Sequence, residues 1–175
     1  MSTIDQTRSS RASGSEARAS GASKGRGADR AICAFFVGER CFGLDVGLVG
    51  EVVEIDRVAE VPLAPPEIVG LFSLRGAPVP IVDLSSALGA GAPRSTARIA
   101  LVLRTETLVA ALSIDRMDGV VPAGRGTSIH ANDEGESALV AGFLEVDGRA
   151  SVITTISTPA LVAHLERLRF ARAEG

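Results

Sequence analysis

The segment LFSLRGAPVPIVDL, residues 71–84, decides the fold of this chain. Its apolar residues belong to two short runs, at about 69–75 and 77–83, which predict two β-strands. Gly76 stands between the runs and allows the chain to turn tightly there. The segment is therefore expected to form a pair of short strands around a tight turn.

Three residues of this segment do not suit an ordinary buried strand. Pro78 and Pro80 lack the backbone N–H on the same side of the second strand, so that side is expected to be an edge or bulged. Arg75 is costly to bury without a partner, which predicts an acidic partner or a surface that meets one. Glu51 is the candidate because it also interrupts an apolar run. The alternative is that both charges only mark solvent-facing sides.

Short apolar segments punctuated by glycine and proline continue along the chain, which is typical of an all-β barrel or sandwich. The small-residue connector at 87–98 divides these segments into two similar sets and favours two small barrels packed together. Further strands are expected in the hairpin at 31–46, at 51–55, and in the segments IALVLR, LVAALSID, GFLEVDG and ASVITTI.

Only the last part of the chain has a clear helical pattern. In STPALVAHLERLRF, Thr158 is the expected N-cap and Pro159 suits the first helical position. Leu161, Leu165 and Leu168 recur at helical spacing and predict an apolar face. We expect a short C-terminal helix that packs on the barrels.

Composition excludes several classes of protein. Residues 1–29 are rich in Ser, Ala, Gly and Arg, which predicts a disordered tail, and the remainder is acidic, with 18 acidic and 12 basic residues after position 30. The chain has no Trp or Tyr to stack on bases, so nucleic acid is not an expected partner. It has no apolar run long enough to span a bilayer and no signal-peptide pattern, so we expect no membrane insertion and a cytoplasmic location.

The two cysteines are expected to be reduced and buried. A turn at Gly38 and Glu39 pairs Cys33 with Leu44 and Cys41 with Phe36, so the thiols do not face each other. Buried cysteines of this kind act as small apolar side chains. Neither a disulfide nor a metal site is therefore expected.

The sequence contains no recognisable catalytic apparatus. His130 and His164 stand in no metal-ligand motif, and a solvent-facing imidazole is the expected reading of His164. Asp83 and Asp115 both end apolar strands, where carboxylates commonly accept backbone N–H groups of the next turn. An enzyme or small-ligand barrel that uses these two aspartates is kept as a remote alternative. No cofactor and no metal are predicted.

The stretch VPLAPPEIVGLFSLRGAPVPIVDL, residues 61–84, closely resembles the signature of the CheW family of chemosensory adaptors. The segments around it, FFVGERCFGLDVGLVGEVVEI, ALSIDRMDGVV and VAGFLEVDGRASVITTI, are also similar to that family, so the resemblance covers about 31–165. The matching signature residues are Val61, Pro62, Pro65, Ile68, Gly70, Leu74, Arg75, Gly76, Val79, Pro80, Ile81, Asp83 and Leu84.

The resemblance implies two five-stranded SH3-like barrels around a shared core. It places the family domain at 30–170, with the first barrel mainly at 44–90 and the second mainly at 97–157. The N-terminal hairpin and the C-terminal helix would pack across both barrels.

The resemblance also implies a function. Family members perform no chemistry but bridge chemoreceptor tips to the regulatory domain of a CheA-type histidine kinase, and a receptor hairpin would dock in an apolar groove between the barrels. The partner-binding residues implied are Val49, Glu51, Gly70, Leu74, Arg75, Gly76 and Val120.

Some residues depart from the family pattern. Ser73 stands where Asn is usual and Met117 where Val is usual, and VITTIST lacks a common Leu-Asp. These departures leave open which receptor or kinase is recognised. An adaptor of a non-flagellar pathway and an inhibitory family member are the alternatives within the binding class.

Overall fold

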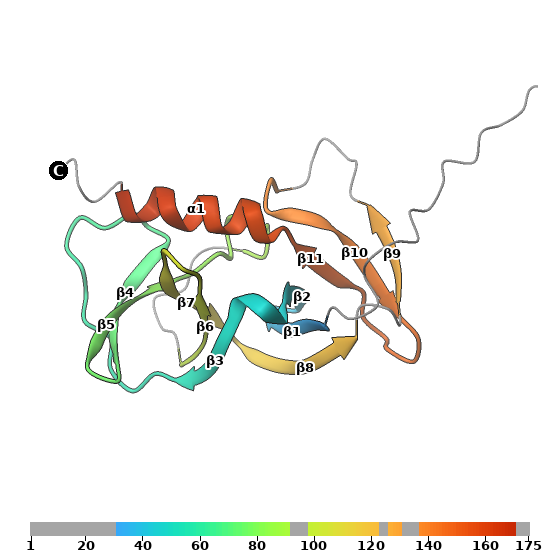
Figure 1. The fold of residues 1–175 in the computed structure, drawn as a ribbon, viewed down its shortest axis with the longest axis horizontal. Helices are drawn as coiled ribbons and strands as arrows, with labels where there is room; N and C mark the ends of the chain where they lie inside the picture. Colours follow the sequence, from blue (N-terminus) through green and yellow to red (C-terminus); the bar gives the residue numbers. More distant parts are fainter. Residues whose placement is uncertain (1–30, 92–97, 123–125, 131–136, 171–175) are drawn as a thin grey trace, which may run out of the picture.

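The computed structural model describes residues 31–91, 98–122, 126–130 and 137–170, so the tail expected at 1–29 lies outside the described residues. Two β-sheets, a short 3-10 helix and a C-terminal α-helix make up this part of the chain (Figure 1). The elements are β1 (Ala31–Val37), β2 (Arg40–Asp45), η1 (Val46–Leu48), β3 (Val49–Glu54), β4 (Ile68–Leu74), β5 (Ala77–Val82), β6 (Ile99–Arg104), β7 (Val109–Ile114), β8 (Arg116–Pro122), β9 (Gly126–His130), β10 (Val140–Val146), β11 (Ile153–Ile156) and α1 (Thr158–Phe170). The expected all-β fold with one C-terminal helix is confirmed.

The larger sheet has the strand order β8-β1-β2-β11-β10-β9. Its two outer strands are close in sequence, because β8 ends at Pro122 and β9 begins at Gly126. The outer strands of a flat six-stranded sheet would lie about 24 Å apart, whereas four peptide units reach at most about 15 Å. The sheet must therefore curl until its edges approach each other, as in a barrel.

The smaller sheet has the order β3-β6-β7-β5-β4, and the chain that leaves β3 ties its two edges together. The Ile55 N–H donates to the Arg98 carbonyl over 2.8 Å, on the β6 side. Four residues later, Ala59 and Leu71 exchange two backbone hydrogen bonds of 2.8 Å each, on the β4 side. The connection from β3 to β4 thus closes this second barrel.

The sequence led us to expect that the strands divide between the two sheets at the 87–98 connector. The structure contradicts this expectation. β6 and β7 follow the connector but join the smaller sheet, where β6 pairs with β3 and β7 pairs with β5. The sequence pattern also does not predict β8 or β9. Alternating apolar residues show that a strand has a buried face but do not identify its neighbour, so the pairing had to come from the tertiary structure.

One hydrophobic core joins both sheets and the helix. Phe42 and Leu44 enter it from the larger sheet, Leu101 and Leu103 from the smaller one, and Leu161 from α1, all with at most 1% of their surface exposed. Figure 1 shows α1 lying along one side of the molecule, from the end of β11 over β7 and β4. The expected shared core is confirmed, and the two barrels are packed as one unit.

The N-terminal hairpin has the expected register. Cys33 pairs with Leu44 and Cys41 pairs with Phe36. Both cysteines are buried and free, and burial raises the pKa of each thiol above its ordinary value. The prediction of two buried cysteines without a disulfide is confirmed.

The cap of α1 is one residue earlier than predicted. The Ser157 hydroxyl oxygen accepts a hydrogen bond from the Ala160 N–H over 3.4 Å, and the Ser157 carbonyl accepts the Leu161 N–H. Thr158 is the first helical residue instead of the cap. Serine and threonine are both suitable capping residues. The Ser157 N–H donates to the carbonyl of Leu139, which is distant in sequence, and this bond fixes the chain so that Ser157 is the cap.

Ser157→Ala is expected to lower the free energy of unfolding by about 1 kcal/mol, because the first turn of α1 then loses its side-chain acceptor. Urea denaturation monitored by circular dichroism measures this change. Thr158→Ala serves as the matched control and should cost clearly less. A larger loss in the Thr158 variant would assign the cap to the threonine.

Candidate functional site

The turn between β4 and β5 presents an arginine in an unusual backbone conformation. Arg75 and Gly76 have φ angles of +52° and +85°, and Leu74 pairs with Ala77 across the turn. Positive φ at both central residues is the type I′ geometry that suits the twist of a hairpin, and an arginine in its first position is uncommon. The Arg75 side chain is 75% exposed, so the turn carries a cation into solvent.

Glu51 of β3 holds this arginine in place. Arg75 Nη2 lies 2.9 Å from Glu51 Oε2, so the predicted pair is confirmed. The pairing of β3 with β6 shifts register between Val49 and Glu51, at Gly50. Such a bulge redirects the following side chain. The Glu51 side chain is 27% exposed, so this pair orients the guanidinium and contributes about 1 kcal/mol or less to stability.

A second arginine completes the cluster. Arg104 Nη2, at the end of β6, lies 4.0 Å from the other Glu51 oxygen, so two guanidinium groups share one carboxylate. The sequence analysis did not predict Arg104 as a site residue. The available signal was that this arginine is the charged residue at the end of the apolar run IALVLR. The cluster has a net positive charge at a surface of an otherwise acidic domain.

A cavity of about 430 Å³ lies beside the two arginines. It brings Leu74 and Arg75, which were predicted site residues, together with residues of β5, β6 and β7 that were not. Its lining residues are Leu74, Arg75, Ala77, Pro78, Val79, Arg104 and Val109. An apolar floor with a cationic rim suits a partner segment that carries both apolar and acidic side chains.

Five of the predicted site residues do not line this cavity. Glu51 and Gly76 adjoin Arg75 through the ion pair and the turn, and the other three are Val49, Gly70 and Val120. Gly70 is buried in β4, and a Cβ atom there would lie 2.4 Å from Val58 Cγ1 and 2.6 Å from the Ala59 carbonyl oxygen. Gly70 therefore allows the β3–β4 connection to approach β4 closely and close the smaller barrel. It is not a surface residue that a partner contacts. Val49 is half-buried against the main core, so it offers a partner only part of its side chain.

Val120 lies on a different sheet from the arginine cluster. It belongs to β8, at the edge of the larger sheet, where it pairs with Cys33. Its side chain is exposed, with 62% of its surface accessible, which is unusual for a valine in a strand. The preceding Gly119 has a φ of +121°, and the β1–β8 register shifts nearby. Val120 is thus presented outward as a separate apolar contact.

The two aspartates considered for catalysis are engaged with backbone amides. Asp83 is buried and its Oδ1 accepts the Ser85 N–H over 2.7 Å. Asp115 is exposed and its Oδ2 accepts the Gly38 N–H over 2.6 Å. These bonds are the structural role that strand-end carboxylates commonly have.

His164 of α1 is not the solvent-facing residue that the sequence suggested. Its Nε2 atom is buried and finds no hydrogen-bond partner, while Nδ1 lies 3.3 Å from Arg167 Nη2. Burial lowers the pKa of His164 below its ordinary value of 6.5, and the Arg167 charge lowers the pKa further, against a smaller opposing effect of Glu67. The residue as a whole is half-buried.

Stability is expected to fall as the pH falls through 6.5. Unfolded His164 takes up a proton near pH 6.5, whereas the folded protein keeps it neutral to lower pH, so acid favours the unfolded chain. Urea midpoints at pH 7.5 and 5.5 measure the effect, in a His130→Gln background that removes the other histidine. His164→Leu should reduce this pH dependence, and an unchanged dependence would contradict the assignment.

The described residues include no helix that is long and apolar enough to cross a membrane. They also contain no group of three or more His, Cys, Asp or Glu side chains placed to hold a metal ion. Both statements apply only to the ranges that the structure covers.

Comparison with known proteins identifies the family. The CheW-like domain profile matches residues 32–166, more than half of the chain. The chemotaxis protein CheW of Rhizobium meliloti (strain 1021) is 30% identical over 125 residues, which are 69% of this chain and 80% of that protein. The chemotaxis protein CheW of Thermotoga maritima is 27% identical over 90 residues, 51% of this chain and 60% of that protein.

A solved structure shares the fold. The scaffolding protein TtCheW from Thermoanaerobacter tengcongensis aligns with a TM-score of 0.60 at 25% identity, over 74% of this chain and 85% of that one. This agreement in structure accords with the profile match. With the profile match covering both sheets and most of α1, the chain belongs to the CheW-like domain family.

Proposed function

We propose that this protein is a non-enzymatic adaptor of a chemosensory array, which couples the cytoplasmic tips of chemoreceptors to the regulatory domain of a CheA-type histidine kinase. The observation that carries the proposal is the arginine corner. Glu51 holds the exposed Arg75 guanidinium at a rigid type I′ turn, on a domain of the CheW-like family. An adaptor acts by presenting such fixed surface groups, without any reacting centre.

Two surfaces are available for two partners. Leu74, Arg75 and Gly76, supported by Glu51, form the first on the smaller sheet, and Val120 marks the second on the larger sheet. Val49, the first residue of β3, contributes a half-buried apolar side chain to the first surface. Because one core joins both sheets, partners bound at the two surfaces would be held in a fixed relative orientation.

Asp83 and Asp115 support a role without catalysis. Each carboxylate already accepts a backbone amide of its own fold, so neither is presented to a substrate as a pair. An adaptor that works at the cytoplasmic side of receptor arrays needs neither cofactor nor metal.

Reconstitution tests the proposal. Receptor-containing vesicles and the CheA-type kinase of the same organism are mixed with and without this protein, and vesicle-bound kinase and its autophosphorylation are measured. We expect the protein to sediment with the vesicles, recruit the kinase and increase its receptor-dependent activity. Binding of the kinase with a loss of activity would identify an inhibitory member instead, and binding of neither partner would overturn the proposal.

A further inference from the structure

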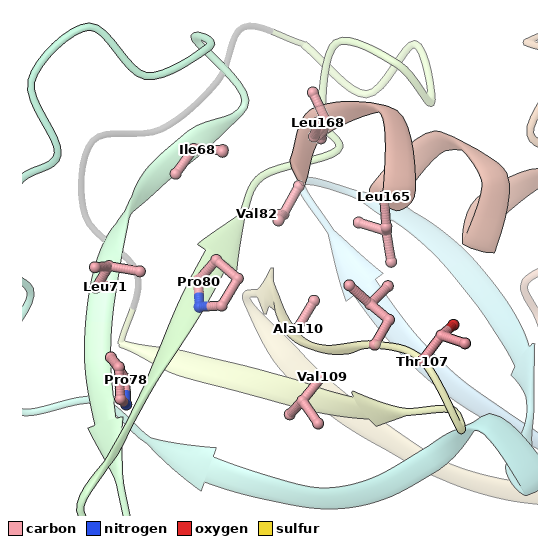
Figure 2. Close-up of a pocket in the computed structure, with 11 residues that line it drawn as sticks. Ile68, Leu71, Pro78, Pro80, Val82, Thr107, Val109, Ala110, Leu165 and Leu168 are labelled. Atoms are coloured by element: carbon pink, nitrogen blue, oxygen red, sulfur yellow. The ribbon is translucent and has the colours of Figure 1, made fainter. Parts of the chain in front are cut away.

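The smaller sheet is open between β5 and β7, under the second half of α1. A cavity of about 360 Å³ occupies the opening. Figure 2 shows Ile68, Leu71 and Pro80 on one side of it, Val109 and Ala110 on the other, and the two α1 leucines at its end. Its lining residues are Ile68, Leu71, Pro78, Pro80, Val82, Thr107, Leu108, Val109, Ala110, Leu165 and Leu168.

The two prolines explain why the sheet opens there. β5 pairs with β7 only through Ile81 with Ala111 and Val82 with Leu112. If this parallel register continued toward the β4–β5 turn, the next N–H directed at β7 would come from residue 80, and the one after it from residue 78. Both are prolines and have no N–H. The side that the sequence predicted to be unpaired is therefore a gap inside a sheet, not an outer edge.

The cavity of the arginine cluster adjoins this cavity, because Pro78 and Val109 line both. The combined groove has unlike ends. Arg75 and Arg104 lie at one end, and both contact Glu51. At the α1 end, Thr107 Oγ1 donates to Glu166 Oε1 over 3.2 Å, which places a carboxylate beside the rim. The groove is thus apolar in the middle, cationic at one end and anionic at the other.

This distribution of charge selects the occupant. The N-terminal 30 residues of the chain are rich in Ser, Ala and Gly and carry six basic against three acidic residues, so they match neither the apolar floor nor the cationic end. A complementary segment has apolar side chains followed by an acidic residue. Its carboxylate can pair with the two arginines more strongly than a neutral group can.

From this groove we infer a further docking site, which begins at Arg75 of the first surface and takes an extended apolar segment of a partner protein with an acidic residue at its Arg75–Arg104 end. The extended form follows from the gap. On this side of β5 the carbonyls of Pro78 and Pro80 remain as acceptors, and the backbone N–H groups of an extended segment can donate to them, whereas a helix has already used its own N–H groups. The inference adds a partner chemistry to the proposed adaptor role but does not depend on the identity of receptor or kinase.

Peptide binding to the full chain tests this site. The probe is a capped seven-residue peptide of alternating leucine and threonine that ends in two glutamates, and its twin ends in two lysines. Titration of ¹⁵N-labelled protein should shift the amide signals of Val109 and Ala110. The glutamate peptide should bind at least about tenfold more tightly than the lysine peptide, a difference that one well-placed charge pair can supply.

Three variants make the test specific. Pro80→Val restores an N–H toward β7 and should reduce binding of the glutamate peptide at least about tenfold. Arg104→Glu should reverse the preference between the two peptides, a result that impaired folding cannot produce. Val152→Glu, an exposed position after β10, is the matched control and should bind like the unchanged protein.

The outcomes separate this inference from the adaptor role. Equal affinity for both peptides, signal shifts away from β7, or full binding by Pro80→Val would each overturn this further docking site. Binding weaker than about 1 mM for the glutamate peptide would do so as well. None of these results would affect recruitment of the kinase to receptor vesicles, which tests the proposed function.

Discussion

Gly70→Ala is expected to lower the free energy of unfolding by about 3 kcal/mol, the upper part of the range for a side chain forced into a packed interior. The added Cβ would lie 2.4 Å from Val58 Cγ1 and 2.6 Å from the Ala59 carbonyl oxygen. The methyl group of Val58 can move, but Ala59 is fixed by its two hydrogen bonds to Leu71. The backbone bridge that closes the smaller barrel must therefore separate.

Urea denaturation measures this loss, and a second glycine provides the control. Gly148 has a φ of +80°, but a Cβ atom added there would have no neighbouring atom within 4 Å. Gly148→Ala therefore has the cost of the backbone conformation alone, about 1 kcal/mol. We expect the Gly70 variant to lose clearly more stability than the Gly148 variant. Equal losses would show that the contact with Ala59 does not constrain β4.

Arg75→Asn is expected to weaken partner binding about thirtyfold while the free energy of unfolding changes by about 1 kcal/mol or less. Asparagine tolerates the positive φ of this position, so the turn stays intact and only the guanidinium is lost. The lost group is one that Glu51 holds in a fixed orientation, which is the condition under which an arginine contributes most to an interface. Binding should therefore suffer far more than folding.

The experiment compares urea midpoints with pull-downs of receptor and kinase for Arg75→Asn, Arg75→Ala and Glu51→Ala, and for the Arg75→Ala/Glu51→Ala double variant. Arg57→Asn removes another exposed arginine, on the β3–β4 connection, and is the matched control. Arg75→Ala should lose somewhat more stability than Arg75→Asn, because alanine does not favour a positive φ. Unfolding of the Arg75→Asn protein, or unchanged affinity for both partners, would contradict the role proposed for this corner.

Local features of the site were predictable from sequence because they depend on neighbours along the chain. The hairpin at Gly38 and Glu39 sets the pairing of both cysteines through turn length alone. The partnership of Arg75 and Glu51 followed from the cost of leaving a charge unpaired among apolar strands, and the structure confirms it. The unpaired side of β5 followed from two prolines at a spacing of two.

Other features needed the three-dimensional arrangement. Ser157 and Thr158 are both suitable caps, and a backbone contact with Leu139 decides between them. The histidine of α1 was expected to face solvent because it stands in no metal-ligand motif, yet its Nε2 atom is buried. Arg104 joined the site only because β6 pairs with β3 and ends beside Glu51.

By itself, the sequence determined the all-β class, the strand positions in the hairpins, the apolar face of the helix and the charge pair at Arg75. These depend on periodicity, on turn residues and on the cost of burying charge, all of which act over short stretches of chain. The tertiary structure alone decided that β6 and β7 complete the smaller sheet, and that the side of β5 without N–H groups is an internal groove. The physical reason is that every strand offers hydrogen bonds on two sides to any neighbour in register, so only the packing of the whole chain selects the partner.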